Sequence, residues 1–225
     1  MKTLVISLGG SLIVPEEVDF EFLKNFKLLI EEFIKKDFRF IIITGGGRTA
    51  RNYMAAANKV SKLHKEDVDW LGIHATRINA HLLRTIFRSH AHKRIITNPC
   101  EKISFKEKIL IGAGWKPGFS TDMDSVLLAK QFEVKQVINL SNIEYVYDKD
   151  PKKFEDAKKI KQISWSAFRK IVGDEWDPGL NAPFDPVASK EAQKDGMTVI
   201  ITNGKDLKNL KSIFEGKTFK GTIIS

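Results

Sequence analysis

The sequence predicts an α/β fold in which a mostly parallel sheet lies between two layers of helices, a three-layer α/β/α sandwich. Short, almost continuously apolar runs, such as residues 3–8 and 39–44, alternate with longer segments of helical periodicity. Glycine clusters follow several of these runs, at the position where open α/β sheets bind ligands. With 225 residues, of which 42% are hydrophobic and 29% charged, the chain can bury one substantial core.

The elements follow from these patterns in order. Apolar runs rich in β-branched residues predict strands, and apolar residues three and four positions apart predict helices. The predicted strands cover residues 3–8, 39–44, 94–97, 108–111, 136–140, 197–202 and 222–224. The predicted helices cover residues 19–36, 49–62, 67–90, 122–132, 164–172, 185–194 and 207–214.

Composition narrows the class of protein. The net charge is +9, but lysines and arginines are interleaved with acids and form no basic run, which disfavours nucleic acid as the main partner. The N-terminal apolar run lacks a small-residue cleavage site, and no run is long enough to cross a bilayer. The single cysteine, Cys100, forms no pair and no metal cluster. We therefore expect a cytoplasmic protein.

Three glycine-bearing turns are candidate phosphate sites. Gly9-Gly10-Ser11 follows the first predicted strand, Gly45-Gly46-Gly47 follows the second, and residues 112–121 precede a predicted helix. Glycine lets backbone amides approach a phosphate closely, and a helix N-terminus adds unpaired donors. One such turn is as well explained by local geometry alone; three at strand ends favour a protein that binds several phosphates.

Two standard phosphate-binding motifs fit the sequence poorly. The Walker pattern is absent, and the Gly45-x-Gly47-x-x-Ala50 match to the dinucleotide fingerprint is followed by a predicted helix instead of a strand.

Two further features are candidate site residues. The stretch 142–151 offers tyrosines beside polar groups, which suits an adenosine but equally suits a surface loop. Asp122 and Asp185 lie at predicted helix starts, where they could cap a helix or organise a phosphoryl-transfer centre.

Seven segments give the chain a family resemblance over nearly its whole length. They are ISLGGSLI, TGGGRTARNY, DWLGIHATRINAHLL, PGFSTDMDSVLLA, NIEYVYDKDPKK, FDPVASK and GTIIS. In this order and spacing, the chain resembles the UMP kinases of the amino-acid-kinase superfamily, particularly the archaeal type. The resemblance implies the amino-acid-kinase fold in a single domain, Mg²⁺ and ATP-dependent phosphorylation of UMP in pyrimidine synthesis, and a homohexamer built from dimers.

The resemblance also implies roles for matching residues. An acceptor part, residues 1–134, would bind UMP, and residues 135–225 would bind ATP. Asp122, Asp185, Arg48 and Arg51 would act at the centre of transfer, with Mg²⁺ carried by the ATP phosphates. The residues implied in ATP binding are Gly9, Gly10, Ser11, Gly47, Arg51, Ser141, Asn142, Tyr147 and Asp150. Those implied in UMP binding are Gly46, Asp69, Gly114, Trp115, Lys116, Pro117, Gly118, Phe119, Ser120 and Thr121.

Several positions depart from the family pattern. Ser7 stands where many members have a lysine, and Arg48 could supply that charge, although arginine is not a free replacement for lysine. Tyr145 stands for a glycine, and Trp115, Lys116 and Phe119 replace small residues; residues 174–183 also diverge. The alternatives are a kinase of this superfamily with another small phosphate or carboxylate acceptor, a UMP kinase with an altered donor site, and a non-catalytic nucleotide-binding or storage protein.

Overall fold

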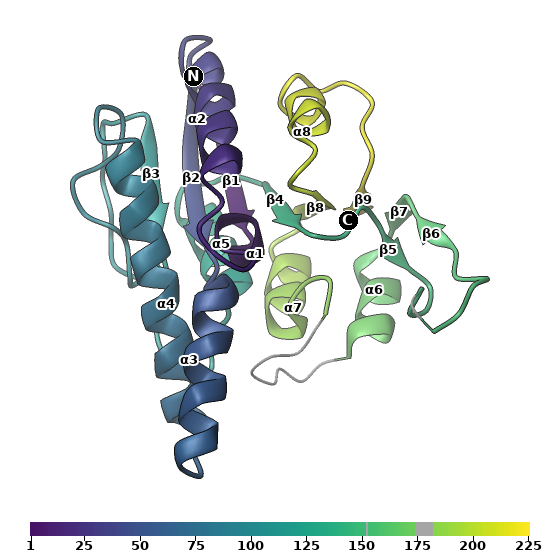
Figure 1. Cartoon of the computed structure of the whole chain (residues 1–225). Coiled ribbons are helices and arrows are strands. Elements are labelled where there is room, and N and C mark those ends of the chain that lie inside the picture. The colour runs from purple at the N-terminus through teal and green to yellow at the C-terminus, as the bar shows by residue number, and fades with distance from the viewer. Residues whose placement is uncertain (152, 174–181) are drawn as a thin grey trace.

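A seven-stranded sheet with the strand order β3-β2-β1-β4-β8-β9-β7 forms the centre of the molecule (Figure 1). The computed structural model describes residues 1–151, 153–173 and 182–225. The strands of the sheet are β1 (Lys2–Leu8), β2 (Phe38–Thr44), β3 (Ile109–Gly112), β4 (Gln136–Ser141), β7 (Gln162–Ile163), β8 (Thr198–Asn203) and β9 (Thr222–Ile224). A separate hairpin pairs β5 (Val146–Tyr147) with β6 (Lys159–Ile160).

The predicted parallel sheet is confirmed for its main part. Strands β3, β2, β1, β4 and β8 are all parallel to one another, whereas β9 runs antiparallel to β8. Within this register Ser7 on β1 lies opposite Ile43 on β2 and Asn139 on β4. The carboxyl ends of five adjacent strands therefore meet at one edge of the sheet.

Helices cover both faces of the sheet, which confirms the three-layer prediction. The helices are α1 (Gly10–Ile13), α2 (Phe20–Ile34), α3 (Gly47–Val60), α4 (Lys65–Ile86), α5 (Thr121–Gln131), α6 (Trp165–Val172), α7 (Pro186–Lys194) and α8 (Leu207–Phe214). Along each central strand, alternate side chains enter two separate cores: Leu4 and Ile6 pack with α2, α4 and α8, while Val5 packs with α5, α6 and α7.

Side-chain caps explain where several helices begin. The side chains of Asp19, Ser164, Asp185 and Asp206 each accept the backbone amide three residues further on. Asp185 is thus a helix cap, as its sequence position allowed. Asp122 is not a cap, because Ser120 caps α5 by accepting from the Met123 amide, and this leaves the Asp122 carboxylate available for other partners.

The predicted strand at residues 94–97 is wrong. Only Ile96 pairs with the sheet, through an isolated bridge to Gly112. Asn98-Pro99 ends the extended stretch directly afterwards, and proline removes a ladder donor, so no longer pairing with β3 forms. The short elements α1, β5, β6 and β7 have no counterpart in the predicted set, because two- to four-residue elements carry no readable periodicity.

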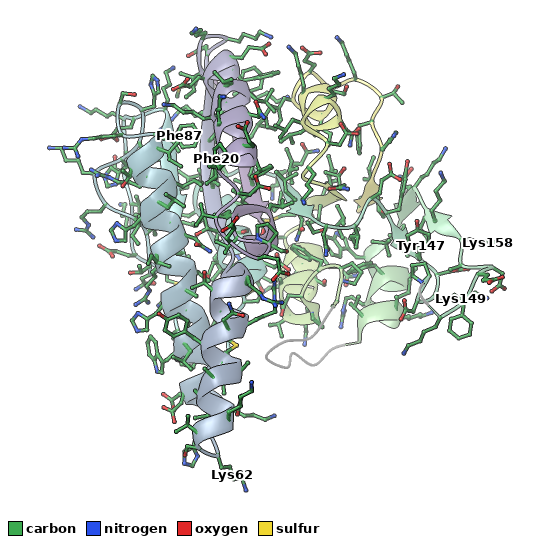
Figure 2. The ribbon with its side chains drawn as sticks, viewed as in Figure 1. Phe20, Lys62, Phe87, Tyr147, Lys149 and Lys158 are labelled. Atoms are coloured by element: carbon green, nitrogen blue, oxygen red, sulfur yellow. The ribbon has the colours of Figure 1, made fainter. Side chains whose placement is uncertain are left out.

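The paired helices α3 and α4 project beyond the sheet (Figure 1), and Lys62 lies at the end of this projection (Figure 2). Ala50 is the single buried residue of α3, so most of this helix faces solvent. In the parts of the chain that the structure describes, no helix combines the length and apolarity needed to cross a membrane.

Candidate active site

The candidate site lies where β1 and β2 end and their glycine turns meet. Gly10 packs so closely on the second turn that an added Cβ would lie 2.1 Å from the Gly47 nitrogen and 2.5 Å from the Gly45 carbonyl carbon. Gly47 has φ +62°, and a Cβ there would lie 2.3 Å from the Gly10 oxygen. Only glycines allow the two turns to touch backbone to backbone.

This contact creates a cluster of free backbone donors. Among the described residues, the amides of Gly10, Ser11, Gly46 and Gly47 find no hydrogen-bond acceptor. Successive free amides in glycine turns at helix starts form a concave anion site. We call these four amides the amide cradle.

Asn79 on α4 fixes the orientation of half of the cradle. Its Nδ2 donates to the carbonyl oxygens of Gly45, at 2.8 Å, and Gly46, at 3.2 Å. In a planar trans peptide the N–H points opposite to the C=O. Holding these two carbonyls toward α4 therefore turns the amides of Gly46 and Gly47 away from it.

A buried carboxylate, Asp122, joins three elements beside the cradle. Its Oδ1 accepts from the Ser7 hydroxyl and from Asn139 Nδ2, both at 3.0 Å, and its Oδ2 accepts from the Asp185 amide at 3.1 Å. Ser7 and Asn139 reach the same oxygen because they are register partners on β1 and β4. Ser7 thus serves as a donor to Asp122.

Burial raises the pKa of each of three nearby carboxyl groups. Desolvation, with the charge of Asp185 as a second cause, raises the pKa of Asp122 to about 6. Desolvation likewise raises the pKa of Asp124 to about 8, partly offset by the hydrogen bond from the Trp115 amide. The pKa of Asp185 is also raised by burial, opposed by the Ala188 amide and the Ser120 hydroxyl. A buried acid cluster of this kind is typical of functional sites.

These pKa shifts predict how stability depends on pH. Because the folded pKa values of Asp122 and Asp124 lie above their usual 3.8, the folded state binds more protons than the unfolded state between about pH 4 and about pH 8. Their contribution to the free energy of unfolding therefore falls as pH rises through this window. We expect Asp124→Asn, measured by urea unfolding, to gain roughly 1–3 kcal/mol relative to wild type between about pH 5 and about pH 8. An unchanged difference between the two proteins across that range would show that Asp124 does not titrate there.

The loop from Gly114 to Thr121 is tied to α4 and α5. The Gly114 amide donates to Thr76 Oγ1 at 2.8 Å, and the Gly118 amide donates to Asp69 Oδ2 at 2.9 Å. Ser120 caps α5 and Thr121 begins it. The remaining members of the implied UMP set, Trp115, Lys116, Pro117 and Phe119, lie between these anchors.

The two arginines implied in catalysis lie at the start of α3. Arg48 pairs with Glu16, with 3.1 Å between Nη2 and Oε2, so its charge is already partly compensated. Arg51 is exposed and forms no ion pair within the described part of the chain. Of the two, Arg51 is the freer cation beside the cradle.

The implied adenosine pocket lies along the segment that follows β4. Ser141 Oγ accepts from the Ile143 amide at 3.3 Å, and Asn142 is exposed. Tyr147 is half-buried on β5, in the hairpin that lies across the molecule from α3 and α4 (Figure 2). Asp150 lies 4.0 Å from Lys153, measured from Oδ2 to Nζ. Tyr145 is buried. Its φ is not positive, because among the described non-glycine residues only Asp37 and Glu133 have a positive φ. A tyrosine in place of glycine therefore causes no backbone strain at this position.

The sequence did not single out the residues that support the site through hydrogen bonds to its backbone or to Asp122. They are Asn139, Thr76, Arg77, Asn79 and Asp124. Asn139 interrupts an apolar strand, and Thr76 and Asn79 are buried polar residues of α4. A polar residue on an otherwise apolar buried face is the signal that could have found them, since such groups need specific partners.

Comparison with known proteins fits this geometry. Residues 2–203 match the model of the amino acid kinase family. The chain belongs to the amino acid kinase family. This amino acid kinase is 32% identical over 224 residues to the uridylate kinase of Thermococcus sibiricus, covering 98% of each chain. It is 34% identical over 227 residues to the uridylate kinase of Thermococcus gammatolerans, again covering 98% of each. The crystal structure of uridylate kinase from Archaeoglobus fulgidus superposes with a TM-score of 0.82 at 29% identity, covering 100% of both chains.

Proposed function

We propose that this amino acid kinase is a UMP kinase, which transfers the γ-phosphoryl group of ATP to UMP and releases UDP. The observation that carries the proposal is the amide cradle, where four free backbone donors lie at the junction of two glycine turns. Phosphoryl transfer needs such fixed donors, because positioning and charge stabilisation supply most of its catalysis. Full-length similarity to proteins named uridylate kinase supports UMP as the acceptor.

On the donor side, Gly9, Gly10, Ser11, Gly47 and Arg51 would take the phosphates of ATP. The adenosine would lie along the segment that holds Ser141, Asn142, Tyr147 and Asp150. Tyr147 offers an aromatic face, and the other three offer polar groups. The division into an acceptor part, residues 1–134, and a donor part, residues 135–225, remains a prediction.

On the acceptor side, Gly46 and the loop from Gly114 to Thr121 would surround the UMP phosphate and uracil. Asp69 would hold the ribose hydroxyls. Its Oδ2 already accepts the Gly118 amide, which leaves Oδ1 for a hydroxyl donor. This arrangement links ribose recognition to the position of the loop.

In the transfer itself, a phosphate oxygen of UMP would attack the γ-phosphorus in line with the leaving ADP. The cradle amides and Arg51, with Arg48 where it leaves Glu16, would stabilise the negative charge. Asp122 and Asp185 would hold the ends of β1, β4 and α7 in place around the reacting groups. The reaction requires no side-chain nucleophile.

Magnesium would arrive bound to ATP and would partly neutralise the charge of its phosphates. No group of three acidic, histidine or cysteine side chains among the described residues could hold a metal ion alone. Asp185 Oδ2 is buried, and burial raises the pKa of this carboxyl while the Ser120 hydroxyl is the side-chain group that lowers it, so Asp185 would be the residue to accept from water carried by the ion.

Replacing Asp69 with asparagine tests the acceptor assignment. We expect the Kd for UMP, measured by calorimetry, to rise roughly 10-fold, because a charge-assisted hydrogen bond is lost. The Kd for ATP should stay nearly constant, since the donor residues lie elsewhere. Equal weakening for both nucleotides would refute the assignment of Asp69 to the UMP ribose.

The assembly and compartment belong to the same proposal. A homohexamer built from dimers needs an extensive surface, and the exposed helix pair α3 and α4 offers Tyr53, Val60 and Ile78, each more than 60% exposed. We propose that the protein works in the cytoplasm, in pyrimidine nucleotide synthesis, which supplies its substrate there.

A further inference from the structure

Asp124 on α5 is a buried acid that the proposed transfer step does not use. It is 1% exposed, and its Oδ1 has no hydrogen-bond partner among the described residues. Burying a carboxyl group with only one satisfied oxygen is costly. Its Oδ2 makes one contact that bears on the site, accepting the Trp115 amide at 3.2 Å.

Arg77 on α4 donates hydrogen bonds to the backbone of the same loop, at Gly114 and Trp115. Its Nε donates to the Gly114 carbonyl at 3.2 Å, and its Nη2 donates to the Trp115 carbonyl at 2.8 Å. The guanidinium carbon also lies over the Trp70 ring, 5.9 Å from its centre. The amide and the carbonyl of Trp115 are therefore both held by side chains, one from each flanking helix. We call Asp124 and Arg77 the clamp.

The clamp positions a compact group of side chains. The rings of Trp115 and Phe119 have centroids 4.7 Å apart, and Lys116 Nζ lies 4.2 Å from the first centroid and 5.1 Å from the second. We call Trp115, Lys116 and Phe119 the aromatic cap. No carboxylate pairs with Lys116 within the described parts of the chain, so its charge is available to a phosphate.

We propose that Asp124 and Arg77 are positioning residues, which hold the aromatic cap in place and thereby set the affinity for the nucleoside monophosphate acceptor. The inference rests on the proposed function, in which this loop surrounds UMP. The cap offers two rings to a base and one uncompensated cation to a phosphate. Donor binding lies at other loops, so the clamp should act on one substrate only.

Arg77→Lys is the main test, because lysine keeps the charge but cannot reach two carbonyl groups with a planar fork. Arg84→Lys is the matched control: Arg84 lies on the same helix, and its Nε has no partner among the described residues. We expect Arg77→Lys to raise the KM for UMP roughly 10-fold, with the KM for ATP and the kcat changed less than about threefold. Asp124→Ala should give the same split, since it removes the oxygen that accepts the Trp115 amide.

Hydrogen exchange of residues 113–121 in the unliganded protein gives a second readout, which needs no activity. Exchange in this segment should accelerate in Arg77→Lys and Asp124→Ala, but not in Arg84→Lys, while the central strands stay equally protected. If the wild type fails to phosphorylate UMP, the proposed function fails while this measurement still decides whether the clamp holds the cap. Unchanged exchange, or an equal rise in the KM for UMP and ATP, would overturn the inference.

Discussion

Replacing Gly10 with alanine should nearly abolish activity. The new Cβ would lie 2.1 Å from the Gly47 nitrogen and within 2.7 Å of the Gly45 carbonyl group, and these are backbone atoms that cannot rotate away. The two glycine turns would have to separate, and a displacement near 1 Å in a transfer site costs on the order of 100-fold in rate. We therefore expect kcat/KM to fall at least ~100-fold and the free energy of unfolding to fall by about 1–3 kcal/mol.

Gly216→Ala is the matched control for this variant. Unlike Gly10, Gly216 has a positive φ, of +68°, and nothing lies within 4 Å of an added Cβ. It should lose only about 1 kcal/mol of stability and keep its kcat/KM. If the two variants were equally active, the close approach of the turns would not be needed for catalysis.

The second large effect is expected for Asp122→Asn. Asp122 accepts three hydrogen bonds and faces only donors, from Ser7, Asn139 and the Asp185 amide. An asparagine side chain would point its own NH₂ group at one of these donors. We expect kcat to fall by ~100-fold, because the strand ends and the start of α7 lose their common anchor.

The fall should appear in kcat more than in either KM, since Asp122 holds the site and contacts substrates only at the transfer centre. Asp206→Asn serves as the control, because Asp206 caps α8 and asparagine caps helices equally well. A wild-type kcat in Asp122→Asn would remove Asp122 from the proposed transfer centre.

Most of the fold was predictable because its central strands are buried on both faces. Residues 39–44 read as an unbroken apolar run, and the structure makes them β2. The strand prediction around Ile96 was wrong because a single pair of apolar residues next to Asn98-Pro99 can form either a short strand or an isolated bridge. Composition does not distinguish the two. The two-residue strands are set by tertiary pairing alone.

The site was predictable only where backbone conformation decides it. Glycine turns can be recognised from a few adjacent residues, so Gly10 and Gly47 could be singled out from the sequence. The groups that support them act across the fold: Asn79 lies more than 30 residues from the turn it orients, and Ser7 lies 115 residues from Asp122. No local pattern contains such pairings. Of the divergent residues 174–183, residues 174–181 lie outside the described residues, whereas the replacement at Tyr145 is accommodated without backbone strain.

ADP release from Mg-ATP, followed with a coupled assay, tests the central claim most directly. The acceptor panel should contain UMP, dUMP, CMP, AMP, isopentenyl phosphate, acetylglutamate and aspartate. We predict rapid ADP release with UMP and formation of UDP in equal amount, with slow or no release for the other acceptors. Release with a different acceptor would contradict the substrate assignment, and binding of ATP and UMP without any ADP release would contradict catalysis itself.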